Sequence, residues 1–259
     1  MIEKLIKLPY LKRLIPSIFT RYYRIIKKSR KYYQIEDIKF YLDFLDPMDR
    51  EIILNRVYEK DQVTFIEKKM NDYTFSHFFD IGSNSGYYSF YFANKFKDLK
   101  INSFEPNIDA YNKFVRTLDK NSFRNIELFK FGLSDKEKKI QTWSLVKNGF
   151  VQSNSTILDN NVDLNSKNIK IKDIIVKSGD KIFDFKNKKL CFKIDVEGHE
   201  IYTLKGLTNI LNNNKCLLLV EIFDFNLNIV NEFFKSIDYN QIYYFNNTSY
   251  YAFSNINWK

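Results

Sequence analysis

The stretch 78–86, Phe-Phe-Asp-Ile-Gly-Ser-Asn-Ser-Gly, constrains this chain more than any other feature. Two phenylalanines lead into Asp80, and two glycines follow with polar residues between them. Residues 87–93 are mostly aromatic and can continue as a helix. This order predicts a strand, a tight glycine turn and a helix. Such a turn lets a ligand approach the backbone and directs helix N-terminal N–H groups at it. Many glycine turns are purely structural, so the stretch alone leaves ligand binding open.

A second acid strengthens the case for a ligand. Glu105 ends another short apolar run, residues 101–105, and follows Asp80 by 25 residues. An acid about 20 residues past such glycines commonly binds ribose hydroxyls. Here an acid, Asp80, also precedes the first glycine. A carboxylate at this place suits a ligand that carries an ammonium group better than one that carries a pyrophosphate. S-adenosylmethionine carries both an ammonium group and a ribose diol, so the pair predicts this cofactor and not NAD.

Four segments resemble the FkbM family of S-adenosylmethionine-dependent methyltransferases. They are Asp-Ile-Gly-Ser-Asn-Ser-Gly at 80–86, Phe-Glu-Pro at 104–106, Gly-Leu-Ser-Asp at 132–135 and Lys-Ile-Asp-Val-Glu-Gly-His-Glu at 193–200. Tyr58 and Glu59 resemble a further family position, and the resemblance extends from about Asp46 to Glu221. Ser83 stands where the family commonly has alanine, a change that a small residue should tolerate.

The resemblance implies a set of cofactor-binding residues. They are Glu59, Asp80, Gly82, Ser83, Asn84, Gly86, Tyr87, Glu105, Pro106, Gly132, Leu133 and Asp195.

The apolar pattern predicts an α/β fold. After the strands that end at Asp80 and Glu105, further strands are expected at 126–131, 190–194 and 216–220, with helices between them. Alternating strands and helices favour a parallel sheet covered on both faces, with ligands at the carboxyl ends of its strands. Only four residues separate the last two strands, 241–245 and 250–253, so these form an antiparallel hairpin. A mostly parallel sheet closed by such a hairpin matches the Rossmann-like class I methyltransferase fold.

Two segments lie outside this repeat. Residues 1–34 predict a basic arm of one or two short helices broken near Pro9 and Pro16, and residues 35–259 form the methyltransferase domain. A strand pair at 35–42 and a helix over 51–70 precede the first strand of the sheet. An insertion at about 134–188 contains strands at 142–146 and 169–176 around a polar stretch, which we expect to form a lid or binding loop.

Methyl transfer to a hydroxyl requires a group that accepts the hydroxyl proton. His199, Asp195 and Glu197 follow the fourth strand of the sheet and are the catalytic candidates. His199 is placed ahead of the acids because a neutral imidazole accepts a proton near pH 7, whereas a carboxylate needs a raised pKa. A solvent-facing helix end remains the alternative for this histidine. His77 precedes the first strand and receives no role.

The acids also raise the question of a metal. Asp195 and Glu221 could bind a hard divalent cation such as magnesium, as in some sugar O-methyltransferases. Alternatively, the acids bind the ammonium group of the cofactor and the substrate. The second interpretation is slightly favoured, and Glu221 stays a candidate for substrate or metal.

Charge is concentrated at the N-terminus. Residues 1–31 hold ten bases and one acid, and thus +9 of the net charge of +10. A basic arm with interleaved apolar residues can contact an anionic membrane, or it can pack on its own domain. The segments expected to form the site carry no row of basic residues, which argues against nucleic acid as a substrate or partner. Cys191 and Cys216 are expected to be buried free thiols, as in the cytoplasm. No run long enough to span a membrane and no signal peptide is evident, so the prediction is a cytoplasmic protein, peripheral at the inner face of the membrane if the arm binds lipid.

These observations favour a methyltransferase for a sugar hydroxyl in the biosynthesis of a surface glycan such as capsule or lipopolysaccharide, with a sugar or sugar nucleotide as the acceptor. The alternatives are a methyltransferase for a non-sugar small molecule and a non-enzymatic protein whose basic arm binds membrane or nucleic acid. The sequence does not name the acceptor or the oligomeric state.

Overall fold

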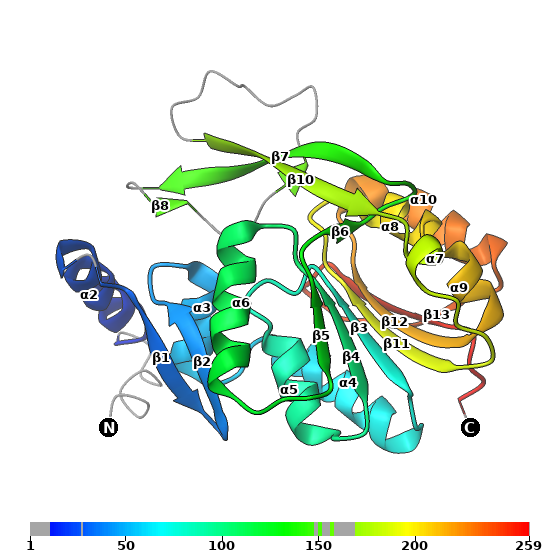
Figure 1. The fold of residues 1–259 in the computed structure, drawn as a ribbon, viewed down its shortest axis with the longest axis horizontal. Helices are drawn as coiled ribbons and strands as arrows, with labels where there is room; N and C mark the ends of the chain where they lie inside the picture. The colour runs from blue at the N-terminus through cyan, green and yellow to red at the C-terminus, as the bar shows by residue number, and fades with distance from the viewer. Residues whose placement is uncertain (1–10, 27, 148–149, 152–155, 158–168, 259) are drawn as a thin grey trace.

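The computed structural model describes residues 11–26, 28–147, 150–151, 156–157 and 169–258. Seven strands form the central sheet: β3 (His77–Ile81), β4 (Lys100–Phe104), β5 (Ile126–Phe129), β11 (Lys189–Ile194), β12 (Lys215–Glu221), β13 (Asn240–Tyr244) and β14 (Tyr250–Ser254). Their order is β13-β14-β12-β11-β3-β4-β5 (Figure 1). Strand β14 runs antiparallel to β12 and β13, and the other neighbours are parallel. The predicted parallel sheet with a C-terminal antiparallel hairpin is confirmed.

Helices cover both faces of this sheet. One core contains Phe78 and packs with α4 (Lys60–Asp72) and α5 (Tyr87–Lys95), while the other contains Phe79 and packs with α8 (Glu200–Lys205), α9 (Thr208–Asn213) and α10 (Asp224–Ser236). Strands buried on both faces need apolar side chains in both directions, which explains the unbroken apolar run Cys216–Val220 in β12 and the adjacent Phe78 and Phe79 in β3. The remaining helices are α3 (Pro47–Asn55), α6 (Ile108–Lys120) and α7 (Gly179–Ile182).

The chain leaves β3 for β4 and β5 on one side and returns to β11 on the other side. At such a reversal the loops after the two central strands, β3 and β11, separate and leave a crevice at the carboxyl edge of the sheet. The glycine turn follows β3, and the Asp195–Glu200 segment follows β11. The fold therefore brings the two most distinctive motifs of the sequence to one place.

The N-terminal region differs from the prediction. A helix, α2 (Leu11–Ile26), continues through Pro16, so the predicted break at Pro16 is wrong. A single proline costs one backbone hydrogen bond and crowds the preceding turn, and the rest of the helix absorbs this cost without ending there. Pro9 lies outside the described residues. The helical part ends at Ile26, since β1 (Arg30–Ile35) already pairs with β2 (Ile38–Asp43) in an antiparallel hairpin. The single helix expected over 51–70 is two helices, interrupted where Arg56 and Glu59 adopt left-handed backbone angles.

The insertion forms a second sheet. It consists of β6 (Gly132–Leu133), β7 (Lys138–Lys147), β8 (Phe150–Val151), β9 (Thr156–Ile157) and β10 (Ile169–Lys177). Strands β7 and β10 are antiparallel and lie above the central sheet in Figure 1. Most of the polar stretch between them lies outside the described residues. No helix in the described segments is long and apolar enough to cross a membrane. Cys191 and Cys216 are buried free thiols, as predicted.

Candidate active site

The glycine turn after β3 is held in contact with the loop after β11. Gly82 has φ +80°, and a Cβ placed on it would lie 1.8 Å from the carbonyl oxygen of Asp195. Gly86 has φ +86°, and a Cβ there would lie 2.6 Å from the ring of Phe114 on α6. Only glycine combines this backbone geometry with so close an approach. Both glycines are therefore required by the packing of the turn.

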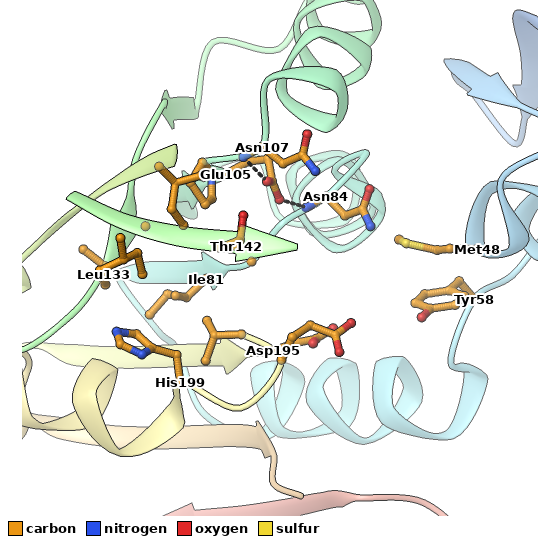
Figure 2. Close-up of a pocket in the computed structure, with 17 residues that line it drawn as sticks. Met48, Tyr58, Ile81, Asn84, Glu105, Asn107, Leu133, Thr142, Asp195 and His199 are labelled. Carbon is orange, nitrogen blue, oxygen red and sulfur yellow. Dashed lines mark hydrogen bonds between the residues drawn. The ribbon is translucent and has the colours of Figure 1, made fainter. Parts of the chain in front are cut away.

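A pocket of about 800 Å³, including solvent at its mouth, opens beside this turn. Figure 2 shows Asn84, Glu105 and Asn107 on one side, Asp195 and His199 on the opposite side, and Met48 and Tyr58 at one end. The lining residues are Met48, Tyr58, Ile81, Gly82, Asn84, Glu105, Pro106, Asn107, Gly132, Leu133, Ile140, Thr142, Ile174, Asp195, Val196, Glu197 and His199. A few polar groups set in apolar walls are typical of a small-molecule site.

Glu105 is fixed by the backbone of the two loops beside it. Its carboxylate accepts hydrogen bonds from the N–H of Asn84 at 2.8 Å and of Asn107 at 2.7 Å. Burial nevertheless raises the pKa of Glu105 to about 7, although these two N–H groups work in the opposite direction. Glu105 lines the pocket, and each of its carboxylate oxygens retains a second lone pair. This acid is thus positioned to accept hydrogen bonds from a pair of ligand hydroxyls.

An acid cluster beside the pocket consists of Glu59, Asp80, Asp195 and Glu221 around Lys193; Lys193 and Asp80 are buried, and the other three are partly buried. The Lys193 ammonium donates to Asp195 Oδ2 at 2.9 Å, and burial, which works to lower its pKa, is outweighed by the surrounding acids. Burial likewise works to raise the pKa of Asp195, but Lys193 outweighs it and the pKa is lowered. Burial and then Asp195 raise the pKa of Glu221. A proton is therefore retained on Glu221 while Asp195 is ionised.

Two tyrosines hydrogen-bond to Glu59 and hold it in this cluster. Tyr88 donates to Glu59 Oε2 at 2.7 Å, and Tyr250 donates to Oε1 at 3.1 Å. Tyr250 also lies 3.4 Å from Asp195 Oδ2. Glu59 adopts φ +46°, a backbone conformation that non-glycine residues rarely take and that is often found at functional sites.

Asp80 lies deeper than the pocket wall. Its Oδ2 accepts from the Ser89 N–H at 3.1 Å and from the Ser89 hydroxyl at 2.5 Å, and Oδ1 has no hydrogen-bond partner among the described residues. Burial raises its pKa. Apart from Glu221, which retains its proton, the cluster sets three carboxyl groups against one lysine, and a cationic ligand would favour their charged forms.

His199 is the first residue before α8 and is held from the opposite side. Its Nε2 lies 2.9 Å from the Ser134 hydroxyl, and that hydroxyl donates to Asp135 at 2.8 Å. Because Ser134 uses its single proton on Asp135, Nε2 of His199 must carry the proton in this bond, which leaves the lone pair on Nδ1. Burial, followed by Lys138, lowers the pKa of His199 to about 4. The imidazole is thus neutral at pH 7, and it is a weaker base than an exposed histidine.

The structure brings most of the predicted residues to the pocket wall. Those that line it are Gly82, Asn84, Glu105, Pro106, Gly132, Leu133, Asp195, Glu197 and His199. Those that do not are Glu59, Asp80, Ser83, Gly86, Tyr87 and Glu221. Glu59, Asp80 and Glu221 belong to the acid cluster, and Tyr87 packs in the core beside Phe40 and Tyr58. His77 is the first residue of β3, at the end of the strand opposite the glycine turn, and it does not line the pocket.

Several site residues were missed from the sequence. Lys193 could have been noticed, because a lysine in the otherwise apolar strand 190–194 is rarely buried without a charged partner. The other missed residues are Met48, Asn107, Ile140, Thr142, Ile174 and Val196 in the pocket wall, and Tyr88 and Tyr250 in the acid cluster; Tyr58, noted with Glu59 in the sequence, also lines the pocket. Ile140, Thr142 and Ile174 come from the second sheet, and nothing in their local sequence relates them to the glycine turn. Among the described residues, no group of three or more histidine, cysteine or acidic side chains is arranged to hold a metal ion.

The pocket fits S-adenosylmethionine by its chemistry. Glu105 offers acceptors for the ribose diol, the apolar walls formed by Ile81, Leu133 and Ile174 suit the adenine ring, and the acid cluster suits the positive charge of the methionine end. Taken with the strand order and the reversed hairpin, these features define a class I S-adenosylmethionine-dependent methyltransferase. The profile of the methyltransferase FkbM domain matches residues 80–242. The chain therefore belongs to the FkbM methyltransferase family.

Solved structures of other methyltransferases are similar to this chain. An rRNA methylase from Streptococcus thermophilus is 13% identical, with a TM-score of 0.42 over 73% of this chain and 93% of that one. A precorrin-6y C5,15-methyltransferase from Geobacter metallireducens is 11% identical, with a TM-score of 0.44 over 76% and 89%. The TYW2 protein of M. jannaschii, in complex with AdoMet, is 11% identical, with a TM-score of 0.40 over 87% and 84%. A search of curated protein sequences returned no match.

Proposed function

We propose that this methyltransferase transfers its methyl group to a hydroxyl of a sugar, in the biosynthesis of a surface glycan. The observation that carries the proposal is the position of His199, whose neutral ring lines the pocket opposite Glu105 (Figure 2). A hydroxyl acceptor needs a group to take its proton, whereas an acceptor that is already a strong nucleophile does not. S-adenosylmethionine would supply a methyl group activated by a positively charged sulfur.

His199 would take the proton at Nδ1 while Ser134 holds Nε2. The acceptor oxygen would gain the methyl carbon as the carbon–sulfur bond breaks, and the hydroxyl proton would move to the imidazole. The link from Nε2 through Ser134 to Asp135 fixes the ring orientation and favours the charged imidazole as it forms. Its low pKa reduces the driving force for this transfer, so proton removal would accompany methyl transfer and not precede it.

The surroundings of His199 support a polyhydroxylated acceptor. Tyr202 stacks on its ring with centroids 4.9 Å apart and is 45% exposed. Phe225 is 74% exposed and lies next to Gly198, 3.4 Å from the position that a Cβ would take there. Aromatic faces beside carboxylates such as Glu197 suit a sugar ring, which presents apolar C–H groups on its faces and hydroxyls at its edges. Both aromatic residues thus lie beside the segment that carries Glu197 and His199.

The acceptor class can be tested by incubating the protein with isotope-labelled S-adenosylmethionine and two panels, one of sugar nucleotides and one of non-sugar phenols, amines and carboxylic acids. A labelled methyl group on a sugar oxygen, located by mass spectrometry, is the expected result. Labelling confined to the second panel would overturn the sugar assignment and leave the methyltransferase assignment intact.

The role of His199 has a separate test. We expect His199→Ala to lower turnover by roughly 10²–10⁴-fold with near-normal cofactor binding, and to remove an acid limb of the pH–rate profile near pH 4. His77→Ala is the matched control, because the pKa of His77 is also lowered to about 4 by burial but the residue lies away from the pocket. A nearly active His199→Ala enzyme would move the role to Asp195 or Glu197. If Asp195 or Glu221 holds a metal instead, a chelator would abolish activity and magnesium would restore it.

A further inference from the structure

Helix α2 packs against the rest of the chain through a narrow face. The ring of Phe19 lies 5.9 Å from that of Phe44, and the ring of Tyr23 lies 5.0 Å from it, with Tyr23 only 8% exposed. Lys31 covers the Tyr23 ring at 5.6 Å. These contacts fix the orientation of the helix relative to the β1–β2 hairpin.

A second apolar face of the same helix is exposed. Ile18, Tyr22, Ile25 and Ile26 are 63%, 53%, 80% and 37% exposed. Their spacing of four, three and one residues places them in one stripe along the helix. Figure 1 shows α2 at the outer edge of the molecule, beyond the β1–β2 hairpin. No element in the described part of the chain covers this stripe, and four large apolar side chains in a row are unusual on a freely solvated helix.

The stripe is bordered by positive charge. Arg21 and Arg24 are exposed on the helix, and Lys28 is exposed just beyond it. The sequence contains no aspartate or glutamate from Lys4 to Ile35. An apolar stripe with a basic border and no acid is the composition of helices that lie in the interface of anionic membranes.

We propose that α2 docks on an anionic phospholipid surface. The Ile18, Tyr22 and Ile25 side chains enter the boundary between headgroups and acyl chains, and the Arg21 guanidinium group contacts lipid phosphates. The face of α2 that packs on Phe44 remains in place, so docking requires no rearrangement of the domain. This surface is distinct from the pocket and does not depend on the identity of the methyl acceptor.

The test uses the full chain with vesicles of phosphatidylcholine alone or with added phosphatidylglycerol. Co-sedimentation should occur only with the anionic vesicles and should weaken as salt is added. Ile18→Ser and Ile25→Ser should each weaken binding by about tenfold or more, and Arg21→Gln by about fivefold. Ile229→Ser is the matched control, since this isoleucine is 44% exposed on α10, and it should leave binding unchanged.

Two results would overturn the proposal. The first is wild-type protein that stays in solution with anionic vesicles at low salt, or that binds them as well after Ile18→Ser and Ile25→Ser. The second is a change of oligomeric state in these variants while vesicle binding stays unaltered, measured by light scattering. That result would show that the stripe is an interface between copies of the chain. Circular dichroism and cofactor binding would show that the variants are folded.

Discussion

Glu105 should release a proton when the cofactor binds. Without ligand, burial raises its pKa to about 7, so about half of the molecules carry a proton on this carboxyl at pH 7. Hydroxyl groups of a bound ribose donate to the charged form and therefore lower the pKa. If the pKa falls by two or more units, about 0.5 proton leaves per cofactor bound at pH 7. The release should fade above about pH 8, where Glu105 is already ionised without ligand.

Titration calorimetry in buffers of different ionisation enthalpy measures this proton directly. Glu105→Gln is the matched variant, because it keeps the shape of the side chain but cannot ionise. It should remove the release and weaken binding by roughly 1.5–3 kcal/mol, the range for hydrogen bonds to a charged group. Other acids in the cluster can also change protonation, so the difference between wild type and variant is the quantity to compare. Equal proton release from both proteins, or none from wild type, would refute the assigned role of Glu105.

The same carboxyl makes a contribution to stability whose sign is fixed by its pKa. A carboxyl pKa raised from 4.5 to about 7 stabilises the protonated folded state, so this contribution is present below about pH 4.5 and is lost as pH rises through 7. The change amounts to about 3 kcal/mol in the free energy of unfolding without ligand. Glu105→Gln should remove this slope in urea denaturation. It should also cost about 1–3 kcal/mol, because its NH₂ group cannot accept one of the two N–H bonds from Asn84 and Asn107.

Two further substitutions test the framework of the site. Gly82→Ala would place a methyl group 1.8 Å from the Asp195 carbonyl oxygen, so cofactor binding should be lost in the same calorimetric assay. Near-normal binding by this variant would contradict the packing argument. Lys193→Met should lower the free energy of unfolding at neutral pH by about 1–3 kcal/mol, because it leaves the partly buried Asp195 without its cation. Adding Asp195→Asn should recover part of that loss in urea denaturation, and a double variant no more stable than the single one would show that the pair is not the cause.

Local patterns in the sequence determined the framework of this protein. Apolar runs, glycines and their spacing predicted β3, β4, β11 and β12 to within a residue or two, and the four residues at 246–249 required the hairpin. These signals are local, because a strand, a turn or a helix depends on the periodicity and turn chemistry of its own residues. Parallel strands share a carboxyl edge, so the acids and glycines at the strand ends could also be assigned to one site.

Only the tertiary structure decided how the site is charged and enclosed. Glu59 and Tyr250 are 191 residues apart and meet because β14 lies next to β12, a neighbour relation that no local pattern encodes. The same holds for the bond between His199 and Ser134, which sets the tautomer of the proposed base. It also holds for Ile140 and Ile174, which reach the pocket from the second sheet. Burial, and with it the pKa of each acid, depends on what the rest of the chain packs around a residue, and this can be known only once the strands are in their final order.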